Sequence, residues 1–119
     1  MRADSQPDRE PLPDEQVGLA VEVFRMLADG TRIRLLWALR ERELSVNELA
    51  ARVAKSPAAV SQHLAKLRMT RLVQTRRDGT TVFYRLENEH VAQLVTDAVH
   101  KAEHSGTDLP EHHLAAARR

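Results

Sequence analysis

The sequence predicts a mainly α-helical domain with one β-hairpin, and three observations lead to this prediction. With two Phe, one Trp, one Tyr and no Cys among 119 residues, the core has to be built from Leu, Val and Ala, which suits packed helices. Apolar residues recur at three- and four-residue spacing along most of the chain. Around Asp78-Gly79 the period changes to two, which is typical of paired strands. The expected order is four helices, a hairpin and a long helix (α-α-α-α-β-β-α).

The chain divides into an N-terminal arm, one domain and a short tail. Residues 1–14 contain three prolines and many charges but almost no apolar side chain, so we expect a disordered arm. Residues 15–104 carry the periodic segments and form the predicted domain. Ser105-Gly106 is expected to break the last helix, which leaves residues 105–119 as a flexible tail that contains histidines.

Two helices are expected before residue 40. The first begins at Glu15, and Gly30 is expected to stop it. Thr31 is expected to cap the second. The apolar residues of the two helices are Val17, Ala20, Val21, Phe24 and Leu27 in the first, and Ile33, Leu35, Leu36 and Leu39 in the second.

A pair of short helices follows, and their arrangement is typical of a helix-turn-helix unit. Ser45 and Glu48 form an S-x-x-E capping box at the start of one helix. Ser56 is the expected N-cap of the other, and Pro57 takes its first position, where a missing N–H costs nothing. On a helical wheel the core face of this second helix consists of Val60, Leu64 and Leu67.

A hairpin and a final helix complete the predicted domain. The runs LVQTRR and TVFYRL are β-prone and are joined by Asp78-Gly79, a strong turn signal. The final helix is expected from about Asn88 to His104. Its apolar stripe consists of Val91, Leu94, Val95, Ala98, Val99 and Ala102.

Basic residues are concentrated in the middle of the chain. Between Arg52 and Arg85, eight basic residues stand against one acid, so this segment carries +7 in a chain whose net charge is +1. A basic block inside a nearly neutral protein indicates a face that binds a polyanion.

The helix-turn-helix and the basic hairpin together predict DNA binding. The outer face of the second helix is small and polar, so it can approach the major groove and reach base edges or phosphates. The hairpin is interpreted as a wing that reaches along the backbone or into the minor groove. The residues predicted to contact DNA are Ser56, Ala58, Ser61, Gln62, Lys66, Arg76, Arg77 and Thr80. His63, on the shoulder of the core face, is expected to pack between helices or touch a phosphate rather than bind metal.

These motifs resemble the ArsR/SmtB family of metal-responsive winged helix-turn-helix regulators. The matching segments are LADGTRIRLL, LSVNELA, SQHLAKLR and RRDGTTVFYRL, and the resemblance covers roughly residues 16–104. It implies a homodimer through the first and last helices and a dyad-symmetric operator in double-stranded DNA. It also implies that metal binding weakens operator binding and releases transcription, as in a repressor.

Five of the six histidines lie between Glu89 and His113. His90 and His104 are fourteen residues apart on the last helix, so they share a face but lie about 21 Å apart along its axis. One ion takes ligands at about 2.0–2.2 Å, so a single helix cannot present both imidazoles to it. Two antiparallel copies of the helix can, which predicts two symmetry-related sites that bridge a dimer.

The resemblance narrows the choice of metal. Zinc-sensing members usually carry Asp-x-His at the start of this helix and His-x-x-His or His-x-x-Glu at its end, and here Asn88 and Lys101 break that four-ligand site. The remaining residues resemble the nickel- and cobalt-sensing subgroup. This implies that the ion is bound by His90, Glu103, His104, His112 and His113. Nitrogen and oxygen ligands without sulfur also suit octahedral Ni(II) or Co(II) better than tetrahedral Zn(II).

Alternative functions stay open at the level of sequence. The nearest is a winged-helix regulator that responds weakly to metal, not at all, or only with a co-regulator. The +7 segment disfavours an adaptor that binds protein instead of DNA. An enzyme is not expected, because the chain has no Cys and no H-E-x-x-H motif. No apolar run approaches the about 18 residues of a membrane span and no signal peptide is recognisable, so we expect a cytoplasmic protein without a membrane partner.

Overall fold

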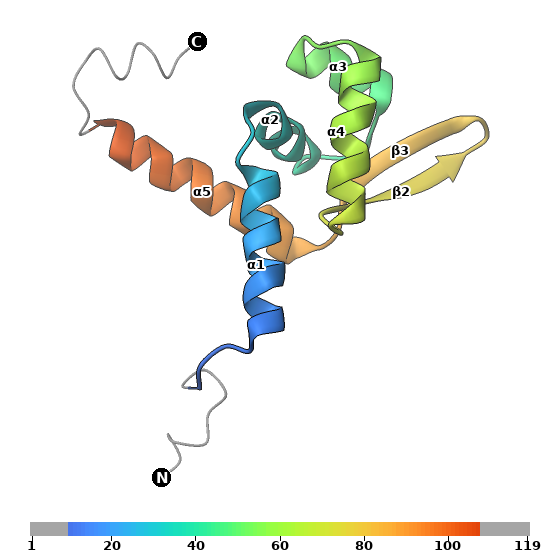
Figure 1. The fold of residues 1–119 in the computed structure, drawn as a ribbon. Coiled ribbons are helices and arrows are strands. Elements are labelled where there is room, and N and C mark those ends of the chain that lie inside the picture. Colours follow the sequence, from blue (N-terminus) through green and yellow to red (C-terminus); the bar gives the residue numbers. More distant parts are fainter. Residues whose placement is uncertain (1–9, 108–119) are drawn as a thin grey trace.

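The computed structural model describes residues 10–107 and confirms the predicted order of the elements (Figure 1). These are α1 (Asp14–Leu27), α2 (Gly30–Leu39), β1 (Leu44–Ser45), α3 (Val46–Val53), α4 (Pro57–Met69), β2 (Val73–Asp78), β3 (Thr81–Leu86) and α5 (Glu89–Thr107). The two-residue strand β1 is absent from the sequence prediction. It pairs antiparallel with β3, so the sheet has the order β1-β3-β2. The fold is a winged helix-turn-helix, mainly helical with a small antiparallel sheet.

The connection between α1 and α2 differs from the prediction at Gly30 and Thr31. α1 ends at Leu27, and Gly30 is the first residue of α2 rather than a stop. Asp29 is the N-cap, because its Oδ1 accepts a hydrogen bond from the Arg32 N–H at 2.9 Å. A carboxylate at this position also faces the positive end of the helix dipole, so Asp29 rather than Thr31 caps the helix.

α5 extends further than predicted. Ser105 and Gly106 lie inside the helix, which continues to Thr107, so the predicted break is wrong. A glycine inside a helix costs only about 1 kcal/mol relative to Ala, which is too little to interrupt a helix whose earlier turns are already formed. His112 and His113 lie outside the described residues.

The core is enclosed by α2, α3, α4, the base of the sheet and the first half of α5. We call α2, α3, α4 and the three strands the head. The largest fully buried side chains are Leu35, Leu36, Leu44, Leu49, Leu64, Leu67, Val60, Val73 and Val95, as expected for a core of Leu and Val. The capping box of α3 is also confirmed: Ser45 Oγ accepts from the Glu48 N–H at 3.2 Å, and the Glu48 carboxylate accepts from the Ser45 N–H at 2.9 Å.

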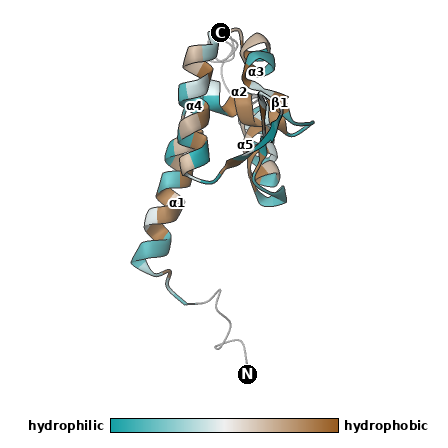
Figure 2. Cartoon of the chain, turned by 90° about the vertical axis from the view of Figure 1, so that its right-hand side faces the viewer, coloured by the Kyte–Doolittle hydropathy of each residue, from teal (hydrophilic) through white to brown (hydrophobic). Residues whose placement is uncertain are grey.

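The two outer helices, α1 and α5, project from the head in different directions (Figure 1). α1 buries only Met26. Hydrophobic (brown) and hydrophilic (teal) residues alternate along its ribbon (Figure 2). The exposed large apolar residues of α1 are Val17, Leu19, Val21 and Phe24. α5 buries Val91 and Val95 in its first half. Within residues 10–107, no helix combines the length and apolarity that a membrane span needs.

Candidate nucleic-acid interface and metal-ligand positions

α4 presents its core face and its outer face as the helical wheel predicts. Val60, Leu64 and Leu67 are fully buried. Ser56 is the N-cap, and its Oγ accepts a hydrogen bond from the Ala59 N–H at 3.1 Å. Because the hydroxyl oxygen accepts in this cap, its hydrogen stays able to donate to another group. The five residues of α4 and its cap that are predicted to contact DNA are all exposed: Ser56, Ala58, Ser61, Gln62 and Lys66.

The turn between α3 and α4 is tight. Ala54 adopts a left-handed conformation with φ 56°, and the Lys55 N–H donates to the Ala50 carbonyl at 3.2 Å. The Ala54 N–H donates to the same carbonyl, so two consecutive N–H groups converge on Ala50 where α3 ends. Three residues separate α3 from α4, as is typical of a helix-turn-helix.

The wing is formed by β2 and β3, and it projects from the head beside α4 (Figure 1). Asp78 pairs with Thr81, so the loop consists of Gly79 and Thr80 and lies one residue later than the predicted Asp78-Gly79 turn. Gly79 has φ +64°, a value that glycine adopts without steric cost. Arg77 and Thr80, both predicted to contact DNA, are exposed near this tip.

Arg76, the remaining predicted DNA contact, already has an anionic partner. Its Nη2 lies 2.8 Å from Glu43 Oε1, and its Nε donates to the same oxygen at 2.9 Å. The guanidinium also lies 5.0 Å from the centre of the Phe83 ring. The hydrogen bond from Arg76 lowers the pKa of Glu43 below its ordinary value. Sequence reasoning missed Glu43, because it lies 33 residues before Arg76 and no local pattern joins them.

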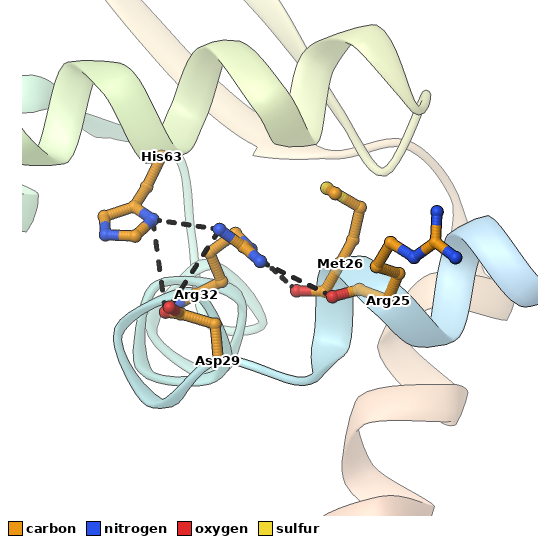
Figure 3. Close-up of polar contacts among 5 residues, drawn as sticks. All are labelled: Arg25, Met26, Asp29, Arg32 and His63. Carbon is orange, nitrogen blue, oxygen red and sulfur yellow. Dashed lines mark hydrogen bonds and ion pairs between the residues drawn. The ribbon is translucent and has the colours of Figure 1, made fainter.

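His63 packs between helices, in agreement with its predicted structural role. Its Nδ1 lies 3.3 Å from Arg32 Nη1 and 4.0 Å from Asp29 Oδ1 (Figure 3). Arg32 is buried and contacts the end of α1 as well. The sequence carries no sign of this cluster, since an arginine beside a capping residue is normally solvated.

The predicted metal ligands within the described residues all lie exposed on α5. His90 lies in its first turn, and Glu103 and His104 lie near its end. Because α5 is one unbroken helix, His90 and His104 are about 21 Å apart along its axis. Within residues 10–107, no three imidazole or carboxylate side chains come close enough together to hold one ion.

Asn88, one of the two residues expected to break a four-ligand zinc site, has a structural role. Its Oδ1 accepts a hydrogen bond from the Val91 N–H at 3.1 Å, which caps the start of α5. The amide oxygen is therefore engaged with the backbone.

Comparisons with known proteins agree with the fold. A family model described as bacterial regulatory protein, arsR family, matches residues 29–75. The HTH-type transcriptional regulator KmtR of Mycobacterium tuberculosis is 70% identical over 116 residues, which cover 98% of this chain and 88% of that protein.

Solved structures show the same architecture. The antimony-specific transcriptional repressor AntR matches with a TM-score of 0.74 at 34% identity, over 87% of this chain and 94% of that one. A homodimeric winged helix-turn-helix DNA-binding domain from Mycobacterium bovis matches with a TM-score of 0.71 at 28% identity, over 79% of this chain and 90% of that one. The chain therefore belongs to the arsR family of bacterial regulatory proteins and is a DNA-binding transcriptional regulator of the ArsR/SmtB type.

Proposed function

We propose that this regulator is a cytoplasmic homodimer whose binding to double-stranded operator DNA is modulated by Ni(II) or Co(II). In this proposal α4 and the wing contact the operator, and the ion is bound where the α5 helices of two copies meet. The proposed DNA contacts are Ser56, Ala58, Ser61, Gln62, Lys66, Arg76, Arg77 and Thr80. The proposed metal ligands are His90, Glu103, His104, His112 and His113.

The DNA face is supported by exposure and charge together. The outer side of α4 carries exposed hydroxyl, amide and ammonium groups, which can donate to phosphates and base edges. Arg77 and Thr80 extend this face along the wing. The segment from Arg52 to Arg85, which includes both elements, carries the +7 charge.

The homodimer is supported by the apolar surface of α1. Leu19 and Phe24 are 64% and 65% exposed, which is unusual for large apolar side chains on one helix of a small domain. A second copy is the partner that can cover this surface, and the related domain from M. bovis is itself homodimeric. In a two-fold assembly the same surface is used by both copies.

The observation that carries the metal proposal is the placement of His90 and His104, exposed near the two ends of one continuous α5. The two histidines are about 21 Å apart in one chain, so they cannot bind the same ion. An ion bound at either histidine needs further ligands from another chain or segment. Two antiparallel α5 helices bring His90 of one copy to His104 and Glu103 of the other. A divalent ion bound there supplies a charged cross-link between the copies.

The donor set supports Ni(II) or Co(II) over Zn(II). Imidazole nitrogens and a carboxylate without any thiolate suit octahedral late first-row ions. Asn88 is engaged in capping α5, so the carboxylate of the usual zinc site has no substitute at that position. The antimony-specific AntR shares the fold, so the scaffold is compatible with regulation by different metals and metalloids.

We retain the division into an arm (1–14), a DNA-binding and dimerisation domain (15–104) and a tail (105–119), with α5 running three residues into that tail. The tail completes the metal site in this proposal, because it carries His112 and His113.

The decisive experiment titrates Ni(II), Co(II) and Zn(II) into the full chain bound to its own promoter DNA. Three variants are compared: His90→Ala, a truncation after Thr107, and His100→Ala as the matched control. His100 is an exposed imidazole on the same helix, outside the proposed ligand set. We expect Ni(II) or Co(II) to weaken DNA binding by the wild type and by His100→Ala. The same ions should have a much smaller effect on DNA binding by His90→Ala and by the truncated chain.

The outcomes separate the parts of the proposal. If none of the three ions changes the affinity, the sensor proposal fails and a regulator that uses no metal or needs a co-regulator remains. If the truncated chain responds like the wild type, His112 and His113 are not ligands. If His100→Ala loses the response, the ligand set is wrong.

A further inference from the structure

Arg32 is the one charged side chain that is buried within residues 10–107, with only 8% of it exposed. A buried guanidinium is destabilising unless its N–H groups are hydrogen-bonded. Its Nε donates to the Met26 carbonyl at 2.8 Å, and its Nη2 donates to the Arg25 carbonyl at 3.4 Å. Its Nη1 lies 3.3 Å from His63 Nδ1 and 4.0 Å from Asp29 Oδ2 (Figure 3). All three nitrogens of the guanidinium therefore have partners.

Arg32 and these partners connect three different helices. Arg25 and Met26 belong to the last turn of α1, whose terminal carbonyls have no partner inside the helix. Arg32 belongs to the first turn of α2, and His63 lies in the middle of α4. α1 packs mainly against α2, so Arg32 connects the end of an outer helix to the recognition helix across the start of α2. A cation is also favourable at the negative end of the α1 dipole.

Arginine has donors only, so His63 Nδ1 is the acceptor in this hydrogen bond. Ser61 and Gln62, which immediately precede His63, are exposed on the proposed DNA face. The Arg32–His63 contact is therefore made in the same turn of α4 that carries residues of the proposed DNA face.

We propose that Arg32 and His63 are positioning residues for operator binding, because they hold α4 at a fixed orientation relative to α1. This inference rests on the homodimer of the proposed function but not on the metal. In a dimer that binds two half-sites, the recognition helices have to match a spacing of about 34–36 Å. Without the Arg32–His63 contact, α4 still fits one half-site, but the two copies no longer match both half-sites at once.

The test compares His63→Ala with His63→Asn in the metal-free, full-length chain. Asn Oδ1 can accept from Arg32 much as Nδ1 does, whereas Ala cannot. One DNA probe is the footprinted segment of the chain's own promoter, and the other is the same duplex cut to one half of the footprint. We expect His63→Ala to weaken full-site binding by about tenfold, the effect of losing one hydrogen bond to a charged group. We expect a change of less than about threefold on the half-site, and His63→Asn to restore full-site binding.

Thermal unfolding and sedimentation establish that each variant is folded and dimeric. Full-site binding by His63→Ala that equals the wild type overturns the proposal. An equal loss on both duplexes also overturns it, since His63 then contacts DNA directly, and so does an Asn variant as weak as the Ala variant.

Two further outcomes are distinguishable from these. If His63→Ala does not fold, Arg32→Lys replaces it, because a lysine keeps the charge but cannot donate to His63 and both carbonyls together. We again expect a large loss of affinity on the full site and a small one on the half-site. An equal loss on the two duplexes overturns the proposal. A wild-type chain that is monomeric on DNA overturns it as well. A missing metal response, by contrast, affects only the proposed function.

Discussion

The head and the outer helix α1 differ in how far their apolar side chains are buried. In the head, Leu35, Leu49 and Leu64 are fully buried by residues of the same chain. In α1, Leu19 and Phe24 remain mostly exposed, although the helix itself is well formed. The core of the head is therefore completed within one chain, whereas α1 leaves an apolar surface for a partner.

The same contrast holds for the polar groups of the two regions. Arg32, His63 and Asp29 contact each other inside a single chain (Figure 3). His90 and His104 lie far apart on α5 and are too distant for one ion. The cluster that we propose positions α4 is therefore complete within one chain, whereas the proposed sensing depends on what a second copy and the tail bring to α5.

The largest expected effect separates the two regions by stability. Leu64→Ala removes a fully buried side chain from the head, so we expect the free energy of unfolding to fall by about 2–5 kcal/mol. Leu19→Ala is the matched control on α1, and at concentrations where the chain is monomeric it should change the value by less than about 0.5 kcal/mol. Urea denaturation measures both. Equal losses would mean that Leu19 on α1 also packs against residues of its own chain.

The next effect concerns association. Phe24→Ala removes a large exposed ring from α1, so we expect the dissociation constant of the dimer to rise by about tenfold or more. Met69→Ala is the control, because Met69 is an apolar residue that is 83% exposed but lies at the end of α4 in the head. Sedimentation equilibrium measures the constants. An unchanged constant for Phe24→Ala would place the dimer contact elsewhere.

A smaller effect is expected at the wing. Glu43→Gln removes the anionic partner of Arg76, so the guanidinium becomes available for a phosphate. We expect DNA affinity to rise a few-fold and the slope of log affinity against log salt to steepen by about 0.9, the value for one more phosphate contact. Fluorescence anisotropy over a salt series measures both quantities.

Glu41→Gln is the matched control for this experiment. Glu41 pairs with Arg52 at 3.3 Å, so its substitution removes the same charge without releasing Arg76. If Glu43→Gln weakens DNA binding instead, Glu43 serves to orient Arg76 toward the DNA.

The smallest expected effect is a pH dependence within the head. The hydrogen bond from the Arg32 N–H holds the pKa of Asp29 below its ordinary value, and the charge of Arg32 acts in the same direction. A lowered pKa stabilises the fold above the unfolded-state pKa of about 4 and loses this contribution as the pH falls through the folded-state value. Below about pH 4, wild-type stability should therefore fall slightly more steeply than that of Asp29→Asn, in urea denaturation at stepped pH. Parallel curves would show that Asp29 adds no pH dependence.

Much of the DNA face could be predicted from the sequence. Ser56 and Pro57 mark where α4 begins. The three- and four-residue spacing of Val60, Leu64 and Leu67 defines the core face of the helix, and the remaining residues are assigned to the core or the outer face from it. The wing followed from its period-two pattern with an error of one residue in the turn. The start of α2 was harder to predict, because Asp29 and Thr31 are both good caps and only one of them can occupy the position.

Caps, turns and apolar periods act over a few residues, so the order of the longer elements and the direction of each helix face could be read from the residues alone. Which charged groups are engaged depends instead on tertiary contacts. Arg32 is buried at the end of α1, and Arg76 is bound by Glu43, through partners that are distant in the sequence or unremarkable in it. Such contacts depend on where whole helices and strands come to lie, and no local pattern of residue types encodes that position.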